Sequence, residues 1–169
     1  MTPRKQNRNE EGSVLLAALI ILLLVTFLGF NSLTMTSSEL KISGNDRTYR
    51  QNFYRAESVI KEAALDLESR DKATPGNSQL PWLSDGKDPN NTFDPESQQW
   101  NTSGTDQNAS TSSYYTDNSA EYCALRMGVA PGSNQDMSGE RKWEYVIYGQ
   151  SRLSSGQVRI AAGFLKKND

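Results

Sequence analysis

Histidine is absent from this sequence of 169 residues, and cysteine occurs only once, as Cys123. Without histidine, the common catalytic triads and the histidine metal sites are excluded. A single cysteine cannot close a disulfide within the chain, so Cys123 is predicted to be a small buried hydrophobic residue, with pairing between chains as the alternative. Basic and acidic residues nearly balance, at 18 against 20, which argues against a nucleic-acid-binding protein.

Catalytic and metal-binding motifs are also lacking. No nucleophile paired with a base can be read from the sequence, so we expect no enzymatic activity, no cofactor and no metal site. Asp85, Asp88, Asn90 and Asp94 could offer oxygen ligands to calcium. Their spacing differs from that of an EF-hand loop, and Asp and Asn commonly form turns, so turn formation is the favoured role.

Charge is missing from Ser13 up to Glu39, and residues 13–30 read SVLLAALIILLLVTFLGF. Eighteen helical residues span roughly 27 Å, close to the thickness of about 30 Å of a bilayer's hydrocarbon core. The preceding leader, residues 1–12, carries three basic residues and is predicted to stay in the cytoplasm. We therefore expect a single membrane span, with residues from about 31 onward outside the cytoplasm.

Three interpretations compete for the first 30 residues. A secretory signal peptide has a shorter apolar core and a small-x-small cleavage site, and neither is found here. A plain membrane anchor fits the length and the charges. The third interpretation is a leader that is cut between Gly12 and Ser13, just before the apolar run. Gly12 suits this role because it lacks a side chain, and we expect it to be unstructured at the membrane edge.

A helical pattern continues beyond the membrane span. Apolar residues recur at intervals of three and four along one face, namely Tyr49, Phe53, Ala56, Ile60, Ala63 and Leu67. A helix over residues 13–69 would be roughly 85 Å long. Bends or a melted stretch are expected at Gly29 and at residues 43–45, because glycine weakens a helix by about 1 kcal/mol. The apolar face predicts a covering layer.

Residues 71–120 are predicted to form a long loop region with short elements at most, because Pro, Gly and Asn interrupt it throughout. A loop of this length needs anchors on the domain. Five aromatic residues are the expected anchors, namely Trp82, Phe93, Trp100, Tyr114 and Tyr115.

The last part of the chain, residues 121–169, has the alternation of strands. Residues 122–129, 142–148 and 157–165 are three predicted strands. The second places Trp143, Tyr145 and Ile147 on one face. The third does the same with a set of four, Val158, Ile160, Ala162 and Phe164. The predicted fold is α+β, with a long helix packed on a small antiparallel sheet.

Residues 8–70 resemble the type IV pilin superfamily, and more narrowly the PilX-type minor pilins. The short charged leader ending at Gly12 and the start SVLLAALIILLLVTFLG carry the resemblance. The segment NDRTYRQNFYRAESVIKEAALDLE adds the aromatic-x-Ala-Glu stretch of the family, which here comprises Phe53, Tyr54, Arg55, Ala56 and Glu57. The resemblance implies a pilin-like fold, in which residues 13–30 form the filament core and residues 31–70 continue the helix.

The same resemblance implies that a prepilin peptidase cuts between Gly12 and Ser13, and that Ser13 becomes N-methylated. Other major and minor pilins and the inner-membrane assembly platform are the implied partners. The helix surface implied to pack in the filament comprises Val14, Leu15, Leu16, Ala17, Leu19, Ile20, Leu23, Leu24 and Phe27.

One position departs from the family pattern. Most pilins carry Glu at the fifth mature residue, where this chain has Ala17. That Glu is thought to neutralise the terminal amine of a neighbouring subunit, since a buried charge needs a partner. The departure implies a place at or near the filament tip, where the subunit would prime assembly; the alternative is that Ala17 simply faces lipid.

The expected function is that of a minor pilin in a type IV pilus. Two alternatives stay open: a tip pseudopilin of type II secretion, which is usually larger, and a single-span extracytoplasmic binding protein without a filament role. The sequence does not decide whether the pilus serves motility, adhesion, DNA uptake or secretion.

Overall fold

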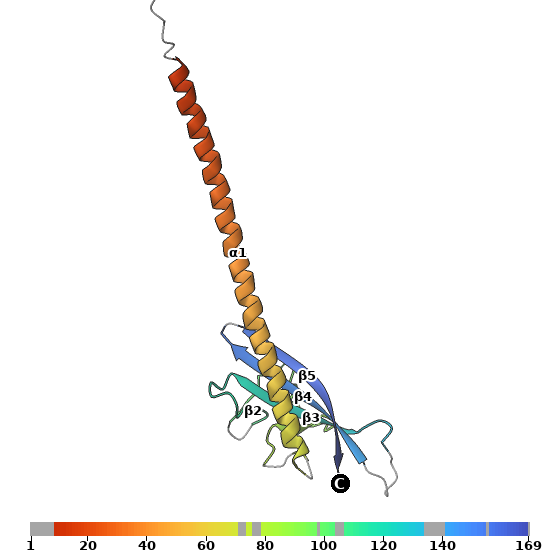
Figure 1. Ribbon diagram of the computed structural model, residues 1–169. Coiled ribbons are helices and arrows are strands. Elements are labelled where there is room, and N and C mark those ends of the chain that lie inside the picture. The colour runs from red at the N-terminus through yellow and green to blue at the C-terminus, as the bar shows by residue number, and fades with distance from the viewer. Residues whose placement is uncertain are drawn as a thin grey trace, which may run out of the picture. The chain divides into compact units, whose positions relative to one another are not determined.

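The computed structural model describes residues 9–70, 74–75, 79–97, 99–103, 107–133, 141–154 and 156–168 (Figure 1). Most of the predicted leader, residues 1–8, lies outside the described residues. Helix α1 (Asn9–Glu68) is followed by five strands. The chain divides into two compact units, Met1–Asp46 and Arg47–Asp169, which we describe separately.

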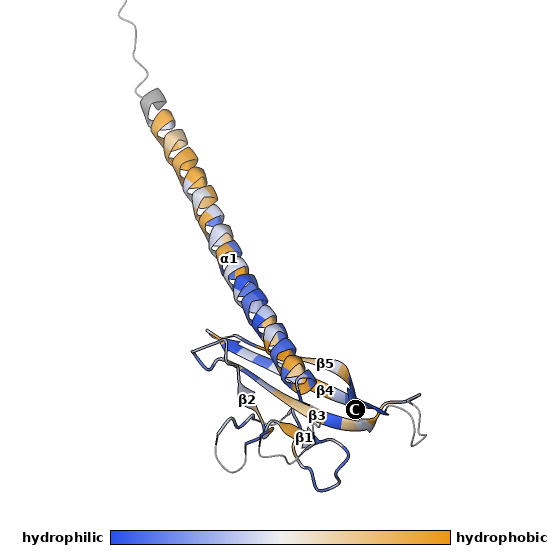
Figure 2. Ribbon diagram, turned by 60° about the horizontal axis from the view of Figure 1, so that its bottom comes forward, coloured by the Kyte–Doolittle hydropathy of each residue, from blue (hydrophilic) through white to orange (hydrophobic). Residues whose placement is uncertain are grey.

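The first unit is helical throughout its described length. Its early part is strongly hydrophobic (Figure 2), and Gly12–Glu68 is long and apolar enough to cross a membrane. The helix continues through Gly29 and Gly44, so the predicted melted stretch is wrong. Several side-chain hydroxyl groups in this unit donate hydrogen bonds to backbone carbonyls of the preceding helical turn. Thr26, for example, donates to the Leu22 carbonyl at 2.8 Å.

The second unit contains a sheet of five strands. They are β1 (Leu83–Asp85), β2 (Ser110–Thr111), β3 (Ala120–Val129), β4 (Arg141–Leu153) and β5 (Gly156–Asn168). Their order is β1-β3-β4-β5, and β2 also pairs with β3. Strands β3, β4 and β5 are antiparallel neighbours, as predicted.

The sheet is nevertheless mixed rather than purely antiparallel, because β1 pairs with β3 in parallel. Both β1 and β2 lie in the region that was predicted as loop with short elements. Strands of two or three residues are too short to show an alternating pattern, so no pattern in the sequence predicts this pairing.

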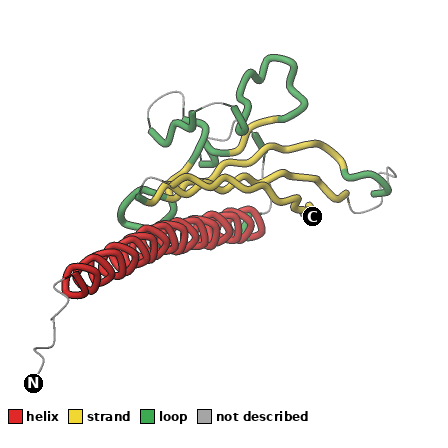
Figure 3. The backbone as a smooth tube through the Cα atoms, turned by 90° about the horizontal axis from the view of Figure 1, so that it is seen from above, coloured by secondary structure: helices red, strands yellow, loops and turns green. Residues whose placement is uncertain are grey.

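The helix residues of the second unit lie along one face of the sheet (Figure 3). Four residues of the predicted apolar helix face (the apolar stripe) are buried in this interface: Ala56, Ile60, Ala63 and Leu67. Ile60, Ala63 and Leu67 belong to one core cluster with Tyr145 and Ile147 of β4, which were predicted to face the core. The prediction fails at the start of the stripe, where Tyr49 is 59% and Phe53 is 37% exposed. The buried face there begins at Asn52, a polar residue.

A smaller cluster lies on the opposite face of the sheet. Cys123 points there because its neighbours on β3, Tyr122 and Ala124, belong to the main core. Trp100 and Ala109 of the long loop cover Cys123. Its thiol is free and buried, which confirms the predicted packing role, and burial raises its pKa.

The predicted aromatic anchors differ in their burial. Trp82 and Trp100 are buried, and Phe93 and Tyr115 are half-buried against the two clusters. Tyr114 is 71% exposed, so its prediction as an anchor is wrong. Its neighbour Tyr115 takes the inward position, with its hydroxyl 2.9 Å from that of Ser58.

Candidate functional site

The exposed surface of the apolar helix is the first functional feature. All side chains predicted for the filament core are exposed, from Leu15 at 72% to Ile20 at 49%. Ala17 is exposed among them, and no carboxylate occurs between Ser13 and Ser38. So continuous an apolar surface requires a bilayer or other apolar helices around it.

The predicted cleavage junction lies on this helix. Gly12 and Ser13 are both helical and exposed, and the helix begins upstream at Asn9. The sequence predicted an unstructured Gly12, and the structure differs. Cleavage at this bond would therefore require the first helical turns to open, and a glycine there lowers the cost by about 1 kcal/mol relative to alanine.

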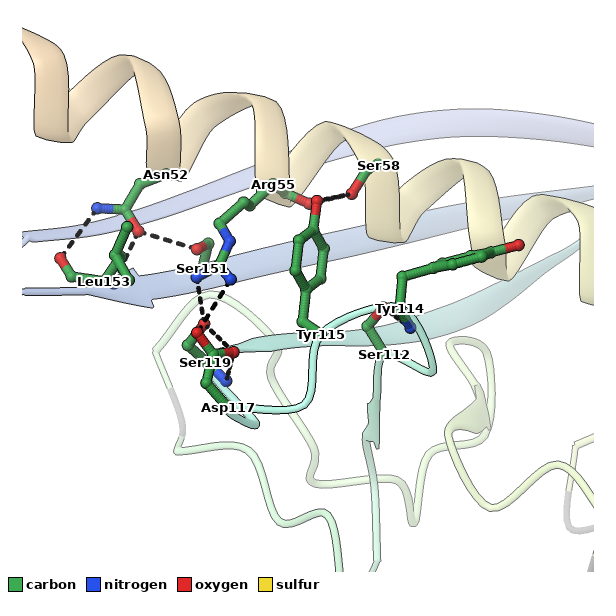
Figure 4. Close-up of polar contacts among 10 residues, drawn as sticks. All are labelled: Asn52, Arg55, Ser58, Ser112, Tyr114, Tyr115, Asp117, Ser119, Ser151 and Leu153. Atoms are coloured by element: carbon green, nitrogen blue, oxygen red, sulfur yellow. Dashed lines mark hydrogen bonds and ion pairs between the residues drawn. The ribbon is translucent and has the colours of Figure 1, made fainter.

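A loop strap, residues 112–119, crosses the helix flank in the second unit (Figure 4). Glu62 holds the beginning of the strap, because its carboxylate accepts hydrogen bonds from the Ser113 amide at 2.8 Å and the Ser113 hydroxyl at 2.6 Å. The Ser112 hydroxyl also donates to Glu62, at 2.5 Å.

Arg55 holds the other end of the loop strap. It donates to the Ser119 hydroxyl at 2.6 Å and pairs with Asp117 at 2.9 Å. Its guanidinium also lies 4.3 Å from the centre of the Tyr115 ring, whose hydroxyl is 2.9 Å from that of Ser58. Hydrogen bonds from Ser119, and then from Arg55, lower the pKa of Asp117 to about 2.

Asn52 fastens the β4–β5 connection to the helix. Its side-chain oxygen accepts hydrogen bonds from the Ser151 hydroxyl and the Leu153 amide, both at 2.8 Å (Figure 4). Its amide nitrogen donates to the carbonyls of Leu153 at 3.2 Å and Gly156 at 3.4 Å. A fully buried polar side chain is therefore satisfied on both its donor and acceptor sides.

The C-terminal end of α1 is capped from the sheet. The last turn of α1 contains no basic residue. Lys166 of β5, which is buried, donates to the Leu67 carbonyl at 2.5 Å and to the Arg70 carbonyl. A cation is favourable there because the carbonyl end of a helix is partly negative.

Arg159 fixes the long loop to the other face of the sheet. Its guanidinium donates to the Pro95 carbonyl at 2.6 Å and lies 4.9 Å from the centre of the Trp100 ring. The buried Gln150 accepts from Arg159 at 2.9 Å and donates to Glu121 at 3.1 Å. Burial raises the pKa of Glu121.

The oxygen-bearing side chains considered for calcium serve as turn acceptors. Asp88 accepts the Asn90 amide at 2.9 Å, and Asp94 accepts the Glu96 amide at 2.9 Å. Asp85 pairs with Arg126 at 2.7 Å. In the part of the chain that the structure describes, no group of three acidic or cysteine side chains could hold a metal ion.

The family-like motif has three different environments. Phe53 is partly exposed and stacks on Tyr49 with ring centres 6.5 Å apart. Ala56 is completely buried against β4, and Glu57 forms an ion pair with Lys61 at 2.8 Å on the outer face. Of the three, Ala56 is the residue that positions the helix on the sheet.

Sequence reasoning missed the polar contacts that position these elements. No contact was predicted for Arg55, Glu62, Gln150 or Lys166. Asn52 gave one usable signal, since it lies four residues before Ala56 on the face that is buried. The partners of these residues lie far along the chain, so no local pattern shows them.

The first unit is thus a helix that is long and apolar enough to cross a membrane, and the same helix continues into a small α+β unit. Residues 11–61 of the chain match the family model described as PilX N-terminal. The match covers less than half of the chain, so the similarity to PilX N-terminal segments is shown for this part of the chain. No curated protein and no solved structure matches the chain.

Proposed function

We propose that this protein is a minor pilin, a structural and assembly subunit of a type IV pilus. The carrying observation is the apolar helix surface with no cover of its own, lying within the segment that matches the PilX N-terminal family. The chain would first sit in the inner membrane with its N-terminus in the cytoplasm. It would then be cut between Gly12 and Ser13, methylated on Ser13, and extracted into the filament.

The proposed driving force for filament packing is close contact between helices. Lipid tails are as apolar as leucine, so moving the helix from lipid to protein gains little from the hydrophobic effect alone. Van der Waals contacts along Val14 to Phe27 supply the difference. Other major and minor pilins are the proposed neighbours, and the inner-membrane platform is the proposed extraction machinery.

We further propose a position at or near the filament tip. A helix with Ala17 in place of Glu has no carboxylate to neutralise the terminal amine of another subunit. An unpaired buried amine is costly, so this subunit fits best at a position where no neighbouring subunit packs its terminal amine against Ala17. At the tip it would prime assembly.

The loop region could then face the surroundings and contribute to adhesion. Deleting residues 80–118 is a poor test, because it would remove the buried side chains of Trp82, Leu83 and Trp100. Tyr114→Ser is sharper, since this exposed side chain can be removed without opening the core. Lower adherence with an unchanged number of pili would support the contact, and unchanged adherence would exclude Tyr114 from it.

The decisive test is the mass and N-terminal sequence of the membrane-extracted protein, in strains with and without the prepilin peptidase. An N-methylated Ser13 that depends on the peptidase would support the proposal. An intact leader in both strains would indicate the alternative, a single-span binding protein. Gly12→Leu should block cleavage and assembly together, whereas Gly29→Leu, on the same exposed helix surface, should leave cleavage intact.

A further inference from the structure

A cavity of about 550 Å³ on the second unit is lined in part by strand β1. Its volume falls within the range of about 300–1,000 Å³ that is typical of ligand pockets. Of its ten described lining residues, six are polar, namely Ser84, Asp85, Asp88, Asn90, Asn91 and Gln107. Ligand pockets are usually lined mainly by apolar side chains, so this cavity suits a ligand that is itself rich in polar groups.

The polar side of the cavity is built on a closed turn, residues 85–91, that begins at the end of β1. The Asn91 side-chain nitrogen donates to the carbonyl of Asp85, the last residue of β1, at 2.7 Å. Asp88 holds the middle of the turn, because its Oδ1 accepts the Asn90 amide at 2.9 Å. The polar groups of the turn are thus positioned before any ligand arrives, which lowers the entropic cost of binding.

Three side chains at the cavity keep hydrogen-bonding capacity after these contacts. Within the described part of the chain, no hydrogen bond involves the second carboxylate oxygen of Asp88, the side-chain amide of Asn90 or the Ser84 hydroxyl. The carboxylate can only accept, whereas the amide and the hydroxyl can both donate and accept. A ligand that carries several hydroxyl groups matches this set, because each of its hydroxyls also donates and accepts.

The charges at the cavity favour a neutral ligand. The Asp85 carboxylate is already neutralised, because it pairs with Arg126 at 2.7 Å. Asp88 then carries the one uncompensated charge among the described lining residues, and none of these residues is basic. Phosphates and acidic sugars would therefore meet a carboxylate without a cation to hold them. A cationic ligand would find a single exposed carboxylate, and such an ion pair contributes little in water.

An apolar strip completes the cavity. Leu80 and Leu83 are almost fully buried, Pro81 is half-buried, and all three line the cavity. A sugar ring has hydroxyl groups around its rim and C–H groups on its two faces. Such a ring can lay one face on the apolar strip while its hydroxyls reach the polar side, so it uses both parts of the cavity.

We propose that this cavity binds a neutral saccharide. One ring face would lie against Leu80 and Pro81, one ring hydroxyl would donate to Asp88, and others would bond to Asn90 and Ser84. The saccharide is a free sugar or part of a glycan, and the recognition chemistry is the same for both. The proposal concerns the folded second unit and depends neither on leader cleavage nor on a role in a filament.

The test is saturation-transfer-difference NMR on the full-length protein in dodecyldimethylamine oxide micelles, because a sugar-based detergent would compete. The neutral probes are the methyl glycosides of glucose, galactose and mannose, and the charged probes are the matching uronic acids and 2-amino sugars. The best neutral probe should bind about fivefold more tightly than its two charged counterparts. Absence of binding by all three neutral probes, or tighter binding of an amino sugar, would overturn the proposal.

Asp88→Asn removes the charge but keeps the turn, since an asparagine oxygen can still accept the Asn90 amide. Binding of the best neutral probe should weaken about tenfold, the expected loss for one charge-assisted hydrogen bond, while the melting temperature stays unchanged. Asp94→Asn is the matched control, because Asp94 accepts the Glu96 amide at 2.9 Å in the same way but is not among the lining residues. Equal affinities of the wild type and Asp88→Asn would contradict the proposal.

Asn90→Ala tests the site independently of charge. This exposed side chain contributes no hydrogen bond within the described part of the chain, so its removal should leave the melting temperature unchanged. The affinity for the neutral probe should fall about fivefold, because a donor and an acceptor for ring hydroxyls are lost. Unchanged binding by this variant would show that the sugar is held elsewhere, and the proposed site would be wrong.

A disaccharide built from the best monosaccharide distinguishes the two sources of the ligand. Maltose, lactose and mannobiose are the probes for glucose, galactose and mannose. A disaccharide that binds about threefold more tightly than the methyl glycoside would support the proposal with a glycan as the source. Equal affinities would support it with a free sugar as the source.

Discussion

The Ala56 carbonyl on α1 lies directly against Gly149 on β4. A methyl group on Gly149 would overlap this oxygen and would also come within 2.8 Å of a carbon of Ile60. Both residues are small and both are buried in the interface between helix and sheet. The helix and the sheet can therefore approach this closely because Gly149 has no side chain.

Gly149→Ala should lower the free energy of unfolding by about 3 kcal/mol, because backbone as well as side chains would have to move. Gly163→Ala is the matched control on the neighbouring strand, and it should change stability by less than about 0.5 kcal/mol since it meets open space. Urea unfolding followed by circular dichroism measures both. Equal losses of stability in the two variants would show that the close approach of the Ala56 carbonyl to Gly149 does not limit the packing.

Asn52→Ala should cost about 3 kcal/mol, because it leaves the buried Ser151 hydroxyl and the Leu153 amide without their acceptor. Ser151→Ala should cost only about 1 kcal/mol, since it removes one partner and leaves Asn52 with three others. The double variant should lose less free energy of unfolding than the sum of the losses of the two single variants. Strict additivity in this cycle would contradict a shared network.

Lys166→Met should destabilise the protein by about 1–2 kcal/mol, because the apolar stem stays while the helix carbonyls lose their cation. Lys61→Met is the control: this lysine is exposed in an ion pair with Glu57, and such pairs contribute less than about 1 kcal/mol. Thermal unfolding can compare the two variants. A wild-type melting temperature for Lys166→Met would mean that desolvation of the ammonium group offsets its contacts.

Stability should fall as the pH drops from about 4 to 2, partly through Asp117. The folded protein holds the pKa of Asp117 at about 2, below its ordinary 3.8. The stabilising contribution is thus present above the unfolded pKa and is lost as pH falls through the folded one. Asp117→Asn should flatten the dependence of the urea midpoint on pH in this window, and an unchanged slope would contradict the role of Asp117.

Glu121 should make the pH dependence of stability run in the opposite direction to that of Asp117. Burial raises its pKa, so the folded state binds its proton more tightly, and the resulting stability is lost as pH rises through the folded pKa. Glu121→Gln keeps the contact with Gln150 and removes the charge. It should raise stability at pH 7 but have little effect at pH 3, as measured by urea unfolding at both pH values.

The fold could be predicted from sequence where one strong period dominates. The continuous apolar run and the three-to-four-residue repeat beyond it predict the helix, alternation predicts the three long strands, and the structure confirms these elements. The buried face of the helix was predicted wrongly at its start, because Tyr49 and Phe53 are apolar but Asn52 is the residue that is buried. A polar residue at a core position can be understood only once its partners on β4 are known.

The candidate site was predictable to a lesser degree. The exposed apolar surface follows from composition, whereas the loop strap depends on Arg55 and Glu62 meeting serines and Asp117 from 50 or more positions later in the chain. Glycines at 29 and 44 misled the prediction of a melted stretch, because a single glycine costs only about 1 kcal/mol in a long helix. The parallel strand β1 had no signal at all.

The contacts of Asn52 and Lys166 also set an order of events during synthesis. The helix leaves the ribosome first, but the residues that cover and cap it lie about 100 positions later, at Leu153 and Lys166. At about 5–20 residues per second, this delay is on the order of 5–20 s. Throughout that time, the helix has only its earlier partners, such as Leu80, Trp82 and Tyr122, and it lacks the β4 and β5 residues that fasten and cap it.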